Sequence, residues 1–158
     1  MTHYEAWSEK RAGEIIAEHV KQEGAALPIL HALQENFGYI HADAVKLTAV
    51  ALNITRAEMH GIVTFYHDFR TEPPGAHVLK LCRAEACQSM GADALAAQAR
   101  EKLRVDWHET TPDRRVSLEP VFCLGLCACA PAAMLDGQVF GRLDAKRLNA
   151  LIDRASQP

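Results

Sequence analysis

The sequence predicts an α/β domain preceded by an N-terminal α-helical bundle. Apolar residues recur at helical spacing through the first part of the chain. The stretch TEPPGA at 71–76 then interrupts this pattern, because two prolines and a glycine cannot continue a helix. Beyond it, short β-type runs and helical segments follow one another. We therefore expect a helical bundle over 1–73 and an α/β domain over 74–158.

The bundle is expected to contain successive helices that have recognisable ends. Ser8 is the expected N-cap of the first helix. Gly38 follows the segment LPILHALQENF, where a C-terminal cap is expected. The segment HADAVKLTAVALN predicts a third helix, and Thr55 and Glu58 have the spacing of a capping box at the start of a fourth. The apolar positions expected to face the core are Ile15, Ile16, Val20, Leu30, Leu33, Phe37, Ala44, Leu47, Ala51, Leu52, Met59, Ile62, Val63 and Tyr66.

The second part alternates strand and helix signals. HVLKLC predicts a short strand, CQSMGADALAAQAREKL predicts one alanine-rich helix, and RVSLEPVFC predicts a second strand that Pro120 interrupts near its end. AAML and QVFGRL flank Asp136 and Gly137, which indicates a β-hairpin with a tight turn. A closing helix is expected after Asp144 as its N-cap.

Composition limits the classes of partner and location. The chain has 158 residues, a formal net charge of -3 and 49% apolar residues, so it has no broad basic field that would attract nucleic acid or an anionic membrane. Its apolar runs are far shorter than the roughly 18 residues that a membrane span needs. The polar N-terminus shows no secretory signal. We expect a cytoplasmic protein, and in that reducing compartment clustered cysteines indicate metal ligands or redox groups.

The five cysteines fall into two groups. Cys82 and Cys87 have four residues between them, and Cys123 and Cys127 have three. Each pair lies at the end of a predicted strand, and strand ends of one sheet lie side by side. Four thiolates brought together in this way suit either a tetrahedral zinc ion or an iron–sulfur cluster. We interpret Cys129 as a small residue of the loop, because two ligands separated by one residue would be cramped on one cluster.

Spacing and surroundings favour the cluster, and zinc stays as an alternative. Structural zinc sites usually contain a C-x2-C pair, and neither pair here has that spacing. A helix expected to begin near Cys87 would direct backbone N–H groups toward the thiolates, and Lys80 and Arg83 are the nearest cations. A dithiol redox protein is a further alternative, although its usual C-x-x-C is absent. No second metal site is expected from the eight histidines. No glycine-rich nucleotide motif is present, so a nucleotide site is expected on a partner.

The second cysteine loop, CLGLCACAP, together with the C-x4-C pair, resembles the thioredoxin-like [2Fe–2S] ferredoxin family, which includes the E subunit of NADH-quinone oxidoreductase. LPILHALQENFGYI and ALNITRAEMHGIVTFYHDFR also resemble family segments, so the resemblance covers nearly the whole chain. It implies a thioredoxin-like [2Fe–2S] domain over 74–158 and one cluster held by Cys82, Cys87, Cys123 and Cys127. Within the family, CRAEACQSMGADAL most resembles the gamma subunit of cytoplasmic NAD-dependent, molybdenum-containing formate dehydrogenase.

This resemblance implies an electron-transfer subunit that has no substrate pocket of its own. Its cluster would exchange single electrons with the FMN of an FMN- and NAD-binding flavoprotein subunit. A larger molybdenum- and iron–sulfur-containing subunit would supply electrons from formate, so FMN and the molybdenum cofactor are expected on partners only. The equivalent subunit of complex I or of an NAD-reducing hydrogenase is an alternative parent. A docking bundle with a vestigial cluster site is a separate structural alternative.

Overall fold

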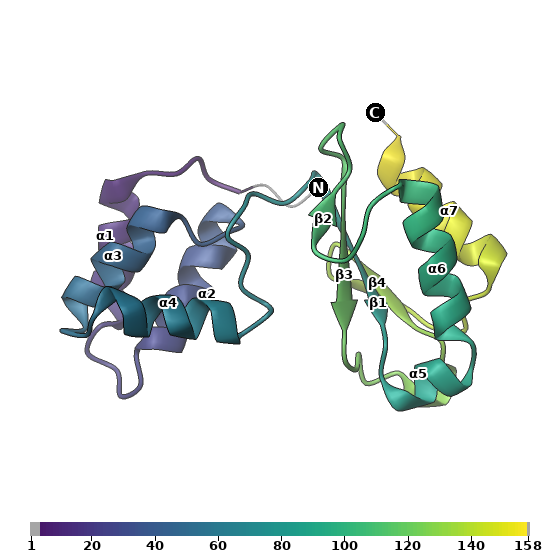
Figure 1. Cartoon of the computed structure of the whole chain (residues 1–158), viewed down its shortest axis with the longest axis horizontal. Coiled ribbons are helices and arrows are strands. Elements are labelled where there is room, and N and C mark those ends of the chain that lie inside the picture. The colour runs from purple at the N-terminus through teal and green to yellow at the C-terminus, as the bar shows by residue number, and fades with distance from the viewer. Residues whose placement is uncertain (1–3, 158) are drawn as a thin grey trace. The chain divides into compact units, whose positions relative to one another are not determined.

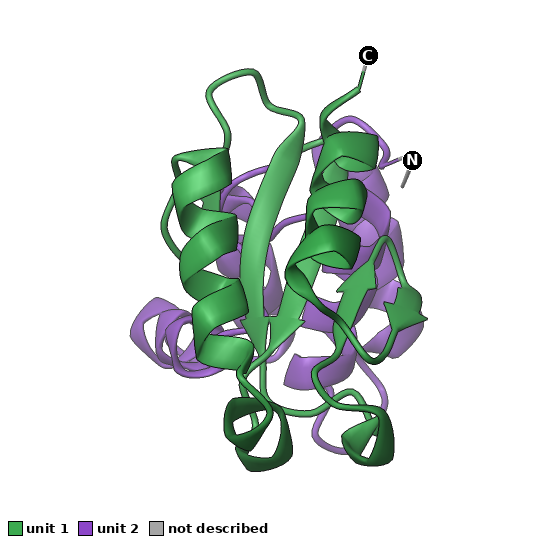
Figure 2. Ribbon diagram, turned by 90° about the vertical axis from the view of Figure 1, so that its right-hand side faces the viewer, with its two compact units in different colours: residues 1–2, 74–158 green, residues 3–73 purple. Residues whose placement is uncertain are grey.

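A computed structural model of the chain describes residues 4–157, and these divide into two compact units on either side of the Pro73–Pro74 peptide (Figure 2). We name them the helical unit, residues 4–73, and the sheet unit, residues 74–157. The predicted ranges 1–73 and 74–158 also include residues 1–3 and 158, which lie outside the described residues. That the two units are separate domains stays a prediction.

Four helices make up the helical unit in its described residues: α1 (Glu9–His19), α2 (Ala26–Phe37), α3 (Ala42–Ala51) and α4 (Arg56–Phe65) (Figure 1). The predicted end signals are confirmed. The Ser8 side chain accepts a hydrogen bond from the Arg11 N–H, and Gly38 ends α2 in the left-handed conformation, with a φ of 81°. Thr55 and Glu58 form the expected reciprocal capping box. The buried core is built from Ala12, Ile15, Ile16, Ala25, Ile29, Leu30, Leu33, Phe37, Ile40, Ala44, Ala49, Met59, Val63 and Phe69.

Two residues predicted for this core are exposed instead. Ala51 is the last residue of α3 and is exposed, whereas Thr48 and Ala49 in the same final turn are buried. Tyr66 follows the end of α4 and has an extended backbone with a ψ of 102°, so it no longer follows the helical period. Its ring packs edge-on against Phe65, which is 71% exposed.

The sheet unit contains a five-stranded sheet in the order β2-β3-β1-β4-β5. The strands are β1 (His77–Cys82), β2 (Glu109–Thr110), β3 (Val116–Val121), β4 (Ala133–Leu135) and β5 (Gln138–Phe140). The helices are α5 (Glu85–Ser89), α6 (Ala92–Leu103) and α7 (Ala145–Ser156), with a short 3-10 turn η1 (Cys127–Cys129). Strand β1 is parallel to β3 and antiparallel to β4. Figure 2 shows α6 and α7 side by side over one face of the sheet, and their apolar side chains pack on Leu79, Leu81 and Leu118.

Several predicted features of the sheet unit are confirmed. Asp136 and Gly137 connect β4 to β5 with left-handed φ values of 50° and 83°, as a tight hairpin turn requires. The Asp144 side chain accepts a hydrogen bond from the Arg147 N–H and caps α7. No helix in residues 4–157 is both long enough and apolar enough to cross a membrane.

Three local predictions are corrected. The segment expected to form one helix from Cys87 forms two, α5 and α6, because Gly91 adopts a left-handed φ of 89° between them. Cys87 therefore lies inside a five-residue helix rather than at the start of a long one. Pro120 does not interrupt β3, since β2 pairs only as far as Leu118 and the missing N–H of Pro120 lies beyond its end. The two-residue strand β2 was not expected.

Candidate metal centre

One edge of the sheet brings the two cysteine loops together. Cys82 is the last residue of β1 and pairs in register with Val121, the last residue of the parallel strand β3. Strand β4 runs the other way and begins at Ala133, opposite Leu81. The carboxyl ends of β1 and β3 and the start of β4 therefore meet at the end of the sheet where α5 lies (Figure 1). Cys123 follows β3 by two residues.

The first cysteine pair is buried among small residues. Cys82 and Cys87 are 3% and 2% exposed and pack with Ala92 and Ala132. Partly buried apolar residues pack around them: Ala84, Val121, Leu124, Leu126 and Ala130. The backbone N–H of Cys82 donates a hydrogen bond to the Ala132 carbonyl at 3.0 Å, which fixes the end of β1 to the segment before β4. This half of the site is therefore shielded from water.

The second pair is exposed and already has the separation of two ligands of one metal. The Sγ atoms of Cys123 and Cys127 lie 3.7 Å apart. Two thiolates bound tetrahedrally at about 2.3 Å from one ion would lie about 3.8 Å apart. The Gly125 N–H donates a hydrogen bond to the Cys123 Sγ at 3.3 Å, and left-handed φ values at Cys123 and Gly125 give the loop this shape. Backbone donors of this kind stabilise thiolate charge.

The thiols of the two loops interact with each other. Burial raises the pKa of Cys87, and the neighbouring thiols of Cys82 and Cys127 raise it further, while a backbone hydrogen bond from Ala132 opposes them. The hydrogen bond and charge of Cys123 raise the pKa of Cys127, and Cys82 adds to this effect. The charge of a thiol in each loop therefore raises the pKa of a thiol in the other loop. A reactive dithiol needs a lowered pKa, so these shifts do not favour the dithiol alternative.

The four cysteine thiols form two pairs rather than one coordination sphere around a single point. In the described part of the chain, no three or more His, Cys, Asp or Glu side chains are arranged around a point that a single metal ion could occupy. A structural zinc ion needs four ligands around one centre, whereas each iron of a [2Fe–2S] cluster takes two thiolates. The paired thiols, the small apolar surroundings and the backbone donors fit such a cluster, and zinc stays as an alternative.

Cys129 is positioned by a different part of the fold. The Arg142 N–H donates a hydrogen bond to the Cys129 carbonyl at 2.5 Å. Gly141 approaches so closely that a Cβ atom there would lie 2.8 Å from the Cys129 Cβ. Cys129 is not among the groups that shift the pKa of Cys87 or Cys127. Its place in the loop therefore agrees with a packing role, which stays a prediction.

Sequence reasoning missed some features of this site. The Ala132 and Gly125 backbone donors depend on loop geometry, although the glycine within CLGLC was a signal for the second. Two large apolar side chains near the cysteines, Met90 and Phe122, are 62% and 74% exposed. The ion pair between Arg83 and Asp93 also links segments whose contact no spacing rule predicts.

The fold and the site define a thioredoxin-like domain with four thiols gathered in two pairs at one sheet edge. The family model described as thioredoxin-like [2Fe–2S] ferredoxin matches residues 12–156. The chain belongs to this family of iron–sulfur electron carriers, which confirms the predicted family and fold class.

Relatives of known name resemble most of the chain. The HndA subunit of the NADP-reducing hydrogenase of Solidesulfovibrio fructosivorans is 32% identical over 78% of this chain and 72% of that protein. The second E subunit of the NADH-quinone oxidoreductase of Rhizobium meliloti is 34% identical over 87% of this chain and 82% of its own length.

A solved structure resembles the chain as well. It is an NAD+-reducing [NiFe]-hydrogenase in the air-oxidized state, with a TM-score of 0.68 and 28% identity over 82% of this chain. The chain spans only 22% of that hydrogenase chain. These three names concern hydrogenases and NADH-quinone oxidoreductase, so the assignment to formate dehydrogenase stays a prediction.

Proposed function

We propose that the chain is an electron-transfer subunit that holds one [2Fe–2S] cluster through Cys82, Cys87, Cys123 and Cys127. The observation that carries this proposal is the pairwise gathering of these four thiols at one sheet edge in a member of a [2Fe–2S] ferredoxin family. When bound, such a cluster supplies a carrier for one electron at a time.

The two thiol pairs have different roles in the proposed site. The buried pair, Cys82 and Cys87, limits access of water to one side. The exposed pair, Cys123 and Cys127, provides the side from which electrons enter or leave. Phe122 directly precedes Cys123, and Met90 ends α5, so two exposed apolar side chains lie on the segments that carry the ligands. Exposed apolar groups of this kind favour a protein interface.

The partner at this interface is proposed to be an FMN- and NAD-binding flavoprotein subunit. The names of the two relatives support an NAD(P)-linked complex, and the chain itself contains no glycine-rich nucleotide motif. A flavin accepts a two-electron hydride and passes on single electrons, which a nearby iron–sulfur centre takes.

The parent complex is proposed to be a cytoplasmic NAD-dependent formate dehydrogenase, in which a larger subunit holds the molybdenum cofactor. The support for this finer assignment is the stretch CRAEACQSMGADAL. The names of the relatives support complex I and an NAD-linked hydrogenase equally well.

Mixing the purified chain with the purified flavoprotein subunit tests the electron-transfer function. NADH should bleach the visible absorbance of the cluster only when the flavoprotein is present. If dithionite reduces the cluster but NADH and the flavoprotein together do not, the proposed partner is wrong. Purification of the native complex then tests the parent: co-purifying molybdenum and formate-dependent reduction of NAD+ support formate dehydrogenase, whereas hydrogen- or quinone-dependent activity without molybdenum excludes it.

A further inference from the structure

One ion pair of the sheet unit is formed by residues that are next in sequence to the buried cysteine core. The guanidinium Nη2 of Arg83 lies 2.8 Å from the Asp93 Oδ1. Arg83 is the residue after Cys82, and Asp93 is the residue after Ala92, which packs against Cys82 and Cys87. Both charges are therefore borne by residues adjacent to members of the buried cysteine core.

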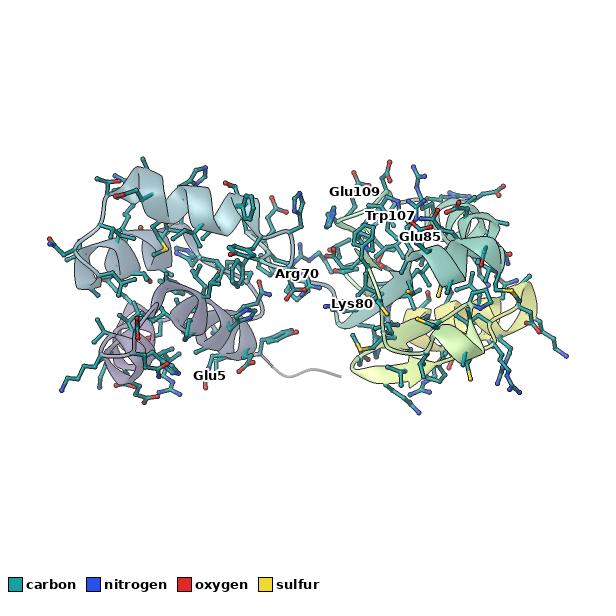
Figure 3. All side chains as sticks on the ribbon, turned by 90° about the horizontal axis from the view of Figure 1, so that it is seen from below. Glu5, Arg70, Lys80, Glu85, Trp107 and Glu109 are labelled. Carbon is teal, nitrogen blue, oxygen red and sulfur yellow. The ribbon has the colours of Figure 1, made fainter. Side chains whose placement is uncertain are left out.

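The Arg83 side chain, paired with Asp93, also packs on an aromatic ring and is partly buried. Its guanidinium carbon lies 5.4 Å from the centre of the Trp107 ring, a cation–π contact with a side chain labelled in Figure 3. The Nε atom of Arg83 is buried and has no hydrogen-bond partner among the described residues. The side chain is 32% exposed, so water screens its charge only in part.

The backbone of Arg83 is fixed as well. Its N–H donates a hydrogen bond to the Val121 carbonyl at 2.8 Å, which joins the first cysteine loop to the end of β3. Its carbonyl accepts a hydrogen bond from the Gln88 side chain at 2.7 Å, which closes the loop around Cys87. Arg83 thus has a constant position relative to both buried cysteines.

We propose that the Arg83–Asp93 pair sets the reduction potential of the cluster held by Cys82 and Cys87, with Arg83 and Asp93 acting in opposite directions. This inference rests on the proposed function. Reduction adds one negative charge to the cluster, so a nearby cation stabilises the reduced form and a nearby carboxylate destabilises it. The pair is nearly neutral as a whole, which is why removal of one member has a larger effect than removal of both.

The test is a set of midpoint potentials measured by EPR on the loaded chain. Arg83→Gln removes the cation and leaves the Asp93 carboxylate unpaired, so the potential becomes more negative. Asp93→Asn leaves the Arg83 cation uncompensated, so the potential becomes more positive. The double variant returns toward the wild-type value, and Arg83→Lys, which keeps the charge, stays close to it.

A matched control is available in the same unit. Lys102 and Asp153 form an ion pair at 2.6 Å with side-chain exposures of 32% and 60%, against 32% and 59% for Arg83 and Asp93. Lys102 lies nine residues after Asp93 on α6, about 14 Å further along the helix. Lys102→Gln and Asp153→Asn should therefore leave the potential unchanged.

The outcomes separate this inference from the proposed function. Opposite shifts for Arg83→Gln and Asp93→Asn support it, because a loop that is merely loosened would shift in one direction for both. No shift, or shifts of the same sign, overturns it. If Arg83→Gln does not retain the cluster, the other two variants still test the inference. Asp93→Asn should then make the potential more positive, and Arg83→Lys should leave it close to the wild-type value. A wild-type chain that takes up no cluster would instead contradict the proposed function.

Discussion

The Sγ atoms of Cys123 and Cys127 lie 3.7 Å apart on an exposed loop. The hydrogen bond with Cys123, and then the negative charge of its thiolate, raise the pKa of Cys127. The loop nevertheless keeps them together through its left-handed turn and the Gly125 N–H. A cation between the two thiolates would offset the repulsion between their charges, which fits a pair of cluster ligands.

Replacement of single cysteines should distinguish the cluster ligands from Cys129, which is not expected to bind the cluster. We expect Cys123→Ser to lose the visible iron–sulfur absorbance, because one iron would then have a single cysteine from the second loop. We expect Cys129→Ser to retain it, because Cys129 packs closely against Gly141 and is not among the groups that raise the pKa of Cys127. Iron content and the absorbance spectrum of each variant provide the measurement.

The two cysteine variants are also controls for each other, since both remove one thiol from the same loop. Circular dichroism should show that both stay folded. Loss of the cluster in Cys129→Ser together with a wild-type circular dichroism spectrum would refute the assignment of Cys129.

The stability of the metal-free chain should depend on pH, and this dependence should have the opposite sign to that of a reactive dithiol. The pKa values of Cys87 and Cys127 are raised in the fold, so the folded chain holds these protons more tightly than the unfolded chain does. Their contribution to stability is complete below the ordinary cysteine pKa of about 8.5 and is lost as pH rises through the raised values. The ultraviolet absorbance of the thiolates and urea unfolding, both followed between neutral and alkaline pH, measure this. Thiolates that form below the ordinary pKa would contradict it.

Gly141→Ala should destabilise the sheet unit and reduce cluster uptake. The added Cβ atom would lie 2.8 Å from the Cys129 Cβ and 2.9 Å from the Cys129 carbonyl oxygen, so the second cysteine loop must move. Overpacking of this kind costs about 1–3 kcal/mol. Gly61→Ala in α4 is the control, because nothing lies within 4 Å of the new atom and the helix gains about 0.5–1 kcal/mol. Urea unfolding and iron content measure both, and equal effects would rule out the contact.

Thr55→Ala should lower the free energy of unfolding of the helical unit by about 1 kcal/mol. The Glu58 N–H donates to the Thr55 hydroxyl at 3.1 Å, and the Glu58 carboxylate accepts from the Thr55 N–H at 2.8 Å. Thr55→Ser keeps the hydroxyl and should behave like the wild type. Thermal unfolding followed by circular dichroism tests this, and cluster content should not change.

Features with a local cause could be predicted from the sequence. The capping box at Thr55 and Glu58 and the turn at Asp136 and Gly137 depend on residues within a few positions of each other. The left-handed Gly91 is also local, but the alanine-rich segment after it concealed the break in the helix. Helical periodicity alone did not reveal that Tyr66 leaves the helix.

Features that depend on tertiary packing could not be predicted. The register that places Cys82 beside Val121 comes from pairing across the sheet. The contact of Cys129 with Gly141 and the ion pair of Arg83 with Asp93 join segments whose approach depends on loop geometry. The sequence predicted which cysteines form pairs, whereas the structure provides the 3.7 Å separation, the burial of Cys82 and Cys87 and the backbone donors.

The most direct test of the central proposal is the iron, acid-labile sulfide and zinc content of the purified chain, with an EPR spectrum after dithionite reduction. We predict two irons and two sulfides per chain, because each iron of a [2Fe–2S] cluster takes two of the four thiolates, and an EPR signal that appears only in the reduced protein. One zinc per chain with no sulfide and no signal would contradict it.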